Sequence, residues 1–162
     1  ADQGSNDSHT IGLYKKYMSS IGKENCDVIV TDHHEIDDGN KCEEAIAFVN
    51  PQRPDDDFDD KTICGCVVAL LVMSATREQM IEDGVVPPST PRLSPLLTYA
   101  CLATVADCVS LASGYNRCIV RRGLRDINNE AIPAWSILKR SIHANFSSRK
   151  KLESVTGRLQ SF

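Results

Sequence analysis

Three consecutive side chains in the first half of the chain could hold a metal ion or move a proton. Asp32, His33 and His34 follow directly on residues 27–31, an apolar run without alternation that predicts a short buried strand. In open α/β sheets, ligands bind beyond the carboxyl ends of the strands, so a site is expected at this position. A carboxylate and two imidazoles cannot all point into an apolar core. The triplet therefore favours a ligand or catalytic role over a structural one.

Asp107 is the second candidate, at the end of a predicted helix of small and apolar residues over 96–106. An unpaired buried carboxylate is costly, so Asp107 needs a metal ion, a basic partner or a helix-capping role, and the capping role stays open at this point. Asp2, on spacing alone, is only a terminal acid. The acidic run over residues 55–60 is interpreted as a solvated loop rather than a metal site, because neighbouring like charges repel one another.

Alternating strands and helices would position these side chains. A second strand is predicted over residues 45–49, where Asn50-Pro51 ends it. Helical spacing and capping signals predict helices over residues 8–21, 65–81, 94–106 and 116–127, the last capped by Asn116, with another starting at Pro133. Strands that alternate with helices predict an α/β fold, with a parallel sheet and flanking helices.

The composition indicates a soluble protein with one ordinary core. The chain has 162 residues and is 41% hydrophobic. Its longest apolar run, residues 63–73, is about half of the roughly 20 residues that span a bilayer, so no membrane association is expected. No segment resembles a signal peptide. Seven cysteines without a Cys-x-x-Cys pair indicate neither a disulfide framework nor a zinc ribbon, which fits reduced thiols in the cytoplasm.

The net charge of −4 hides an asymmetry along the chain. Residues 1–60 carry 15 acidic and 5 basic side chains, whereas residues 61–162 carry 7 and 13. An acidic half can collect divalent metal ions and a basic half can hold phosphates, although two solvated faces would give the same pattern. Three arginines at i, i+4 and i+8 of a predicted helix are candidate DNA-backbone contacts, with a solvated helix face as the alternative: Arg117, Arg121 and Arg125.

Five segments in the same order resemble the DHH phosphoesterases, and in particular the RecJ-type exonucleases specific for single-stranded DNA. VIVTDHHE at residues 28–35 is similar to the motif that names the family. The others are AIAFVNPQRPDD at 45–56, ICG at 63–65, LATVAD at 102–107, and NR at 116–117 with VRRGL at 120–124. The resemblance runs from residue 1 to about residue 127, and five segments in order are far more specific than one.

This resemblance implies a role for each candidate side chain. Asp2, in a DQGS segment similar to the family's second motif, would bridge two metal ions, and His33 and Asp107 would be ligands of one of them. Asp32 would orient this cluster, and His34 would face the substrate phosphate. The implied cofactor is a pair of Mn²⁺ or Mg²⁺ ions, which activate a water and stabilise the leaving oxygen. The mixture of oxygen and imidazole ligands favours Mn²⁺.

The resemblance also implies an activity. It is the metal-dependent 5′ to 3′ hydrolysis of single-stranded DNA to 5′-mononucleotides, in DNA repair and recombination, with other repair or replication proteins as partners. The family's first motif, which carries two metal-binding aspartates, and its second domain are not found in the sequence. Residues 1–127 are therefore expected to be a partial catalytic domain, and residues 128–162 a helical extension or linker toward the missing domain. Little or no activity is expected of the chain alone.

Two other functions remain open. A DHH phosphodiesterase or pyrophosphatase could act on small molecules, although the segment over residues 49–56 argues for the RecJ type. A catalytically degenerate DHH domain could serve as a scaffold in replication. Ala103 and Ser110 stand where Gly and Pro are usual in the family, and neither departure removes a ligand. The sequence gives no indication of the oligomeric state.

Overall fold

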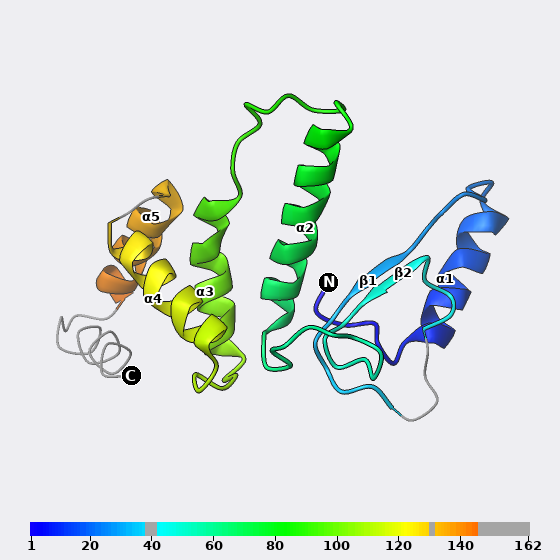
Figure 1. The fold of residues 1–162 in the computed structure, drawn as a ribbon, viewed down its shortest axis with the longest axis horizontal. Coiled ribbons are helices and arrows are strands. Elements are labelled where there is room, and N and C mark those ends of the chain that lie inside the picture. The colour runs from blue at the N-terminus through cyan, green and yellow to red at the C-terminus, as the bar shows by residue number, and fades with distance from the viewer. Residues whose placement is uncertain (38–41, 130–131, 146–162) are drawn as a thin grey trace.

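A computed structural model describes residues 1–37, 42–129 and 132–145 of the chain. The sheet end holds α1 (Ser8–Ser20), β1 (Ile29–Thr31) and β2 (Ala47–Val49), and α2 (Gly65–Glu82) lies beside it (Figure 1). The other end holds the short 3-10 turn η1 (Ser94–Leu96), α3 (Leu97–Ala106), α4 (Gly114–Asn128) and α5 (Pro133–Asn145). None of the described helices is both long enough and apolar enough to cross a bilayer.

The two strands form a parallel sheet, in which Val30 pairs with Phe48 and Thr31 pairs with Val49. The predicted α/β fold, with a parallel sheet and flanking helices, is confirmed. Both strands are shorter than the sequence predicts, and Ile29 is 59% exposed, so β1 is not buried along its length. Because the strands are parallel, both end at the same edge of the sheet, where Asp32 N donates to Val49 O at 3.0 Å.

Helix α1 begins and ends as predicted but buries little of its apolar face. Its residue Ile11 is buried against Val30 of β1. Tyr14 and Ile21, apolar residues that follow Ile11 at helical spacing, are each about half exposed. Gly22 follows with a positive φ of 76°, a conformation that glycine adopts readily, and the helix stops there.

The larger core lies around α2 and α3. Its buried members are Ile63, Cys64, Val67, Val68, Leu70 and Ala100. All seven cysteines are free thiols, and Cys64 and Cys101 are completely buried, so they pack as small apolar side chains. Burial raises the pKa of the Cys101 thiol to about 11, which keeps it protonated and unreactive.

Helices α3 and α4 make the most extensive contact between elements in the described part of the chain. Gly123 of α4 permits this approach. A Cβ atom there would overlap the Cys101 Cβ, and it would lie 2.9 Å from the Cys101 Sγ and 3.0 Å from the Leu97 carbonyl oxygen. The neighbouring Cys101 Sγ also approaches Val120 O at 3.5 Å. The two helices can therefore lie this close only because residue 123 has no side chain.

Helix α4 begins earlier than the sequence predicts. Ser113, rather than Asn116, is its N-cap, and the Ser113 Oγ accepts a hydrogen bond from Asn116 N at 3.1 Å. The Asn116 side chain is completely buried instead, and it donates to Ser110 O at 2.9 Å and to Thr62 O at 3.0 Å. Serine and asparagine are about equally good caps, so residue preference does not decide between them. The two loops before α2 and α4 are tied together by this amide.

The acidic run over residues 55–60 is a loop held by its own hydrogen bonds. Asp60 accepts from the backbone N of Thr62 at 2.9 Å and from the hydroxyl of Ser113. Burial tends to raise the pKa of the Asp60 carboxyl, but the hydrogen bonds from Ser113 and Thr62 outweigh it and hold that pKa below its ordinary value. This carboxylate therefore joins the acidic loop to the start of α4.

Helix α5 packs against α3 through an aromatic pair. Trp135 is buried, and its ring centroid lies 5.0 Å from that of Tyr99. Lys139 Nζ also donates to Asn128 O, at the end of α4, over 3.1 Å. Residues 146–162, which make up half of the predicted extension, lie outside the described residues, and the boundary near residue 127 stays a prediction.

Replacing Gly123 with alanine should destabilise the fold, because the new Cβ would overlap Cys101 at the α3–α4 contact. We expect the free energy of unfolding to fall by about 1–3 kcal/mol, as for other overpacked cores. Chemical denaturation measures this change. Gly114→Ala is the matched control in the same helix, because its Cβ would meet nothing within 4 Å. Equal effects of the two substitutions would contradict the close approach of α3 and α4 at Gly123.

Replacing Asp60 with alanine should reduce stability in a pH-dependent way. The pKa of Asp60 in the folded protein lies below its ordinary value of 3.8, so its ionised form stabilises the fold above that pH. That contribution is lost as the pH falls below 3.8 through the folded pKa. Urea unfolding at pH 7 and pH 3 should show a stability difference between wild type and Asp60→Ala that shrinks in acid. Equal stability differences at the two pH values would contradict this role of the Asp60 carboxylate.

Candidate metal centre

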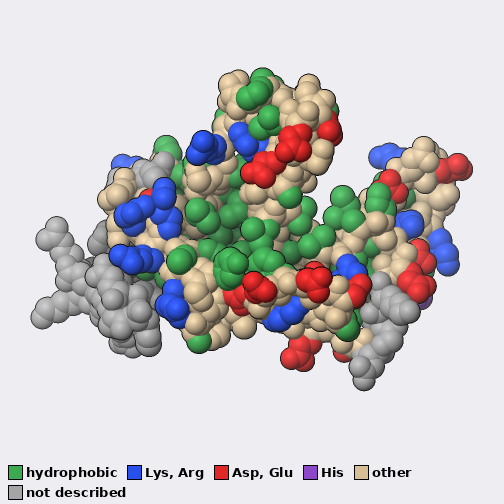
Figure 2. Space-filling view, in the orientation of Figure 1, with side chains coloured by type: hydrophobic (Ala, Val, Ile, Leu, Met, Phe, Trp, Pro, Cys, Tyr) green, Lys and Arg blue, Asp and Glu red, His purple; other side chains and the backbone are tan. Residues whose placement is uncertain are grey.

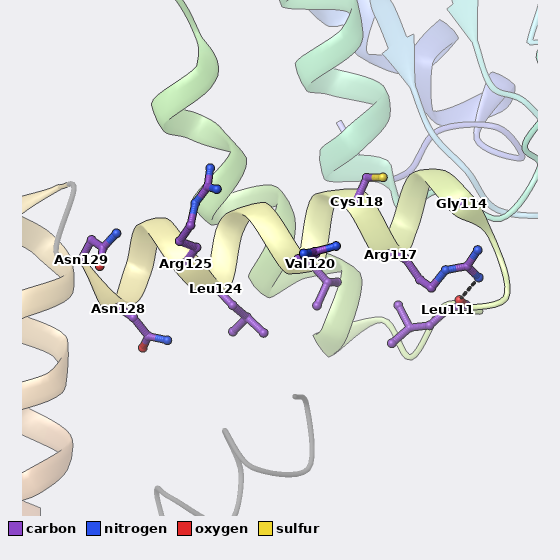
Figure 3. Close-up of a pocket in the computed structure, with 10 residues that line it drawn as sticks. Leu111, Gly114, Arg117, Cys118, Val120, Leu124, Arg125, Asn128 and Asn129 are labelled. Carbon is purple, nitrogen blue, oxygen red and sulfur yellow. Dashed lines mark hydrogen bonds between the residues drawn. The ribbon is translucent and has the colours of Figure 1, made fainter. Parts of the chain in front are cut away.

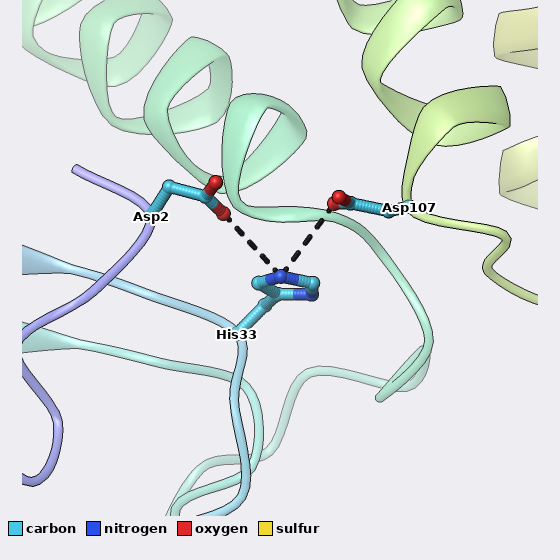
Figure 4. A group of neighbouring side chains, drawn as sticks. All are labelled: Asp2, His33 and Asp107. Carbon is cyan, nitrogen blue, oxygen red and sulfur yellow. Dashed lines mark ion pairs between the residues drawn. The ribbon is translucent and has the colours of Figure 1, made fainter.

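Asp2, His33 and Asp107 meet at one point in the structure (Figure 4). The His33 Nε2 lies 3.3 Å from the Asp2 Oδ1 and 3.6 Å from the Asp107 Oδ2. One ligand atom from each of the three side chains lies within 4.8 Å of the others. Three segments that are far apart in the sequence thus bring one imidazole and two carboxylates together.

Asp2 reaches the cluster from the first residues of the chain. Its backbone N donates to Thr31 O at 2.7 Å, at the carboxyl end of β1, and its φ is 67°, which aspartate tolerates better than most residues. Gly65, the first residue of α2, leaves room for the carboxylate. A Cβ atom at residue 65 would overlap the Asp2 Oδ1 and lie 2.9 Å from the Asp2 Cγ. The carboxylate of Asp2 therefore sits at the positively polarised N-terminus of α2.

His33 and Asp107 come from the ends of a strand and a helix. His33 follows β1 and its side chain is 14% exposed. Asp107 is the C-cap residue of α3, with its N donating to Ala103 O at 2.9 Å, and Cys108 then turns the chain with a φ of 55°. Asp107 therefore caps the end of α3, and its carboxylate faces His33. The C-terminus of α3 is negatively polarised, which favours a cation beside it.

Asp32 does not join the cluster but braces the loop that carries it. Asp32 is 1% exposed. Its carboxylate accepts hydrogen bonds from Ser5 N at 2.9 Å, His33 N at 2.8 Å and His34 Nδ1 at 2.7 Å. Burial tends to raise the pKa of Asp32, but hydrogen bonds from the side chain and backbone of Ser5, from the ring of His34 and from the backbone of His33 outweigh it and hold the pKa well below its usual range. Asp32 is therefore an ionised anchor at neutral pH.

His34 lies beside the cluster with its side chain 59% exposed. Its ring centroid is 4.5 Å from that of His33. The hydrogen bond from its Nδ1 to Asp32 raises the pKa of His34, which favours the protonated ring. With Nδ1 taken by Asp32, Nε2 is the nitrogen left for a ligand, and a protonated imidazole there suits a phosphate oxygen.

The geometry of the cluster fits a divalent metal ion. Carboxylate oxygens and imidazole nitrogens bind such ions at about 2.0–2.2 Å, which puts neighbouring ligand atoms about 3–3.5 Å apart. The distances of 3.3 and 3.6 Å from His33 Nε2 to the two carboxylates are close to that spacing. Without a cation, the two carboxylates would repel each other across the imidazole. A mixed oxygen and nitrogen set is compatible with Mn²⁺.

The three arginines predicted to contact DNA lie on α4, along a groove of about 820 Å³ that Leu111 also lines (Figure 3). Two of them bind their own chain. Arg117 Nη1 donates to Leu111 O at 2.9 Å, and Arg125 pairs with Asp126 at 3.6 Å. The guanidinium group of Arg121 makes no hydrogen bond or ion pair with any other described residue. On the face shown in Figure 2, Lys and Arg side chains gather at the α4 end, and the acidic side chains lie mainly toward the sheet end, where Lys and Arg side chains also occur. None of the candidate metal ligands lines this groove, and the DNA role of the arginines stays a prediction.

The structure adds residues around the site that the sequence reasoning did not single out. Ser5 and Asn50 are buried beneath the cluster, and Gly65 makes room for Asp2. The position of Asn50 was a usable signal, because a polar residue at the exit of the second parallel strand must lie near the exit of the first. Nothing in the spacing of residues pointed to Ser5 or Gly65.

The sequence is similar to part of several curated proteins named single-stranded-DNA-specific exonuclease RecJ. It is 37% identical over 103 residues to the protein of Dickeya dadantii, 37% over 106 residues to that of Salmonella typhimurium, and 37% over 103 residues to that of Escherichia coli. Each match covers 62% of this chain and 17% of the relative, so the chain spans a small part of their length. No family model matches the chain, and no solved structure gives a significant match. The resemblance to part of a RecJ-type protein is confirmed.

Replacing His33 or Asp107 with alanine should weaken Mn²⁺ binding by about tenfold or more, since residues that only support a ligand already change metal affinity by about 10–100-fold. Titration calorimetry with Mn²⁺ on the chain measures the dissociation constant. Asp83→Ala is the matched control, because Asp83 is the C-cap of α2 as Asp107 is the C-cap of α3. Affinity that is unchanged in both His33→Ala and Asp107→Ala would remove these residues from the metal site.

Proposed function

We propose that this chain is part of a RecJ-type exonuclease, in which Asp2, His33 and Asp107 hold a divalent metal ion for the hydrolysis of single-stranded DNA. The observation that carries the proposal is the meeting of these three side chains within 4.8 Å. Sequence similarity to proteins named single-stranded-DNA-specific exonuclease supports the substrate. Mn²⁺ is the preferred ion for this mixed ligand set, with Mg²⁺ as the alternative.

The residues of this chain would have separate tasks in the reaction. Divalent ions, when bound, supply an activated water and charge stabilisation for the leaving oxygen. Asp2, His33 and Asp107 provide the ligands. Asp32 holds the loop of His33 and His34 in place through the hydrogen bonds that it accepts. His34, exposed and with a raised pKa, would donate a hydrogen bond to a phosphate oxygen of the DNA strand.

We further propose that the complete site holds two ions and draws its other ligands from parts of a longer protein. Three protein ligands are few for two ions, and the matched stretch is 17% of the length of each relative. On this account the chain by itself has little or no nuclease activity. The whole enzyme would cut from the 5′ end and release 5′-mononucleotides, in DNA repair and recombination.

The basic face of α4 would add a contact to the DNA backbone that does not depend on base sequence. This face carries Arg117, Arg121 and Arg125, which are spaced about one helical turn apart. The side chain of Arg121 has no hydrogen-bond or ion-pair partner among the described residues, whereas Arg117 and Arg125 each have such a partner. Contacts of this type weaken steeply as salt competes for the phosphates.

The other two functions are less well supported. Hydrolysis of a small phosphodiester would require the same metal ligands but is not the activity in the names of the relatives. A degenerate scaffold has no need to keep three potential ligand atoms within 4.8 Å of one another, as this chain does.

The whole protein, expressed from its full reading frame, should release labelled mononucleotides from 5′-labelled single-stranded DNA when Mn²⁺ is present. His33→Ala should slow this release by about a hundredfold or more, because a catalytic metal contributes several kcal/mol to the reaction. Asp83→Ala, the capping control, should leave the rate unchanged. Gel or chromatographic analysis of the products measures both the rate and the polarity.

Residues 1–162 alone should be nearly inactive in the same assay. Robust Mn²⁺-dependent degradation by this chain, abolished by His33→Ala, would contradict the need for further ligands. A whole protein that binds Mn²⁺ but cuts no single-stranded DNA would favour the scaffold. Release of phosphate from small phosphodiesters alone would favour the second alternative.

A further inference from the structure

We propose that Asn50 is a positioning residue, which ties the Asp2 segment to the loop of His33 and His34 and thereby sets the separation of the metal ligands. The proposal rests on the proposed function for the identity of those ligands. Asn50 itself touches neither the metal site nor a substrate position. It acts through the hydrogen bonds of its side-chain amide.

Asn50 is completely buried, and both the nitrogen and the oxygen of its side-chain amide have hydrogen-bond partners. Its Nδ2 donates to the Ser5 Oγ at 2.7 Å and to the backbone oxygen of His34 at 2.9 Å. Its Oδ1 accepts from the backbone N of Gln52 at 2.8 Å. One side chain thus links three separate segments: the chain after Asp2, the loop after β1 and the loop after β2.

These hydrogen bonds connect the segment that carries Asp2 with the loop that carries His33, and the side chains of these two residues must face each other to bind one ion. Ser5 lies three residues after Asp2, and Ser5 N also donates to Asp32 Oδ2 at 2.9 Å. His34 adjoins His33, whose Nε2 is 3.3 Å from the Asp2 carboxylate. The Asp2 side chain is 55% exposed, so its own burial cannot hold it in place. Its position depends on how the backbone around it is anchored, and Asn50 provides one of those anchors.

Only an amide has the donors that this position requires. Asparagine supplies two N–H groups on one planar nitrogen, whereas an ionised aspartate has none. Asn50→Asp would keep the size of the side chain but would place a carboxylate oxygen against the His34 carbonyl oxygen. It would also add a buried negative charge near Asp32, and both effects should push the two segments apart. Alanine would remove the links without adding charge.

The test compares Asn50→Asp and Asn50→Ala with Gln52→Ala. Gln52 is the matched control because it lies in the same loop, and its Nε2 donates to Lys61 O at 2.7 Å, outside the two ligand-bearing segments. Two properties are measured on the folded chain: the Mn²⁺ dissociation constant, by titration, and the hydrogen exchange rate of the Ser5 amide, by NMR. A purely structural role would lower the melting temperature in all three variants without a selective effect on either property.

We expect both Asn50 variants to bind Mn²⁺ about 10–100-fold more weakly, as is usual when a residue that supports a metal ligand is lost. The Ser5 amide should exchange at least about tenfold faster in these variants, while Gln52→Ala should stay within about twofold of wild type in both measurements. Where the Asn50 variants fail to fold, Ser5→Ala serves instead. It removes the Oγ that accepts from Asn50 Nδ2, together with the side-chain hydrogen bond of Ser5 to Asp32, and should change both properties in the same direction.

Unchanged exchange at Ser5 would overturn the proposal, whatever the metal affinity. Unchanged Mn²⁺ affinity in variants with faster exchange would overturn it too, because the link would then not set the ligand separation. If the Ser5 amide exchanges faster in the variants but neither the wild-type chain nor the whole protein binds Mn²⁺, the link between the segments stands and the proposed metal function fails. The two failures can therefore be told apart.

Discussion

The buried carboxylate of Asp32 is the interaction on which the candidate site depends. Parallel pairing of β1 and β2 brings the ends of both strands to one edge of the sheet, and Asp32 lies there almost completely buried. A carboxylate in that position is stable only if its oxygens are saturated with donors. Backbone N–H groups of Ser5 and His33 and the ring of His34 supply them. Satisfying one buried charge thus orders the loop of the two histidines and the segment that carries Asp2.

The helices complete the site through their ends. The N-terminus of α2 lies against the Asp2 carboxylate, and the absence of a side chain at Gly65 allows this contact. The C-terminus of α3 presents Asp107 from the opposite side. The partial charges of both helix ends favour the arrangement, because the positive end faces a carboxylate and the negative end faces the place for a cation. The candidate cation site is therefore made by the end of a strand, the ends of two helices and the segment that carries Asp2.

Much of this could be predicted from the sequence, but the parts that depend on tertiary contacts could not. The position of Asp32, His33 and His34 at a strand exit followed from local pattern, and so did the helix that ends at Asp107. The convergence of Asp2 and Asp107 on His33 followed only from resemblance to a family, since spacing alone left Asp2 as a terminal acid. The cap of α4 was wrongly given to Asn116, because only the three-dimensional fold shows that its amide is buried between two loops. The exposure of Ile29 and of half the apolar face of α1 was also not foreseeable. A pattern of apolar residues shows which side chains could be buried, but it does not show whether another part of the fold covers them.

The central claim is that His33 binds a metal ion together with Asp2 and Asp107. Pulsed electron paramagnetic resonance of Mn²⁺ bound to the chain tests it most directly, because a directly bound imidazole nitrogen couples to the electron spin of the ion. With ¹⁵N-labelled histidine, we expect a coupled nitrogen that disappears in His33→Ala and persists in His34→Ala and His9→Ala. Absence of a coupled nitrogen in the wild-type chain, or a coupling that survives His33→Ala, would contradict it.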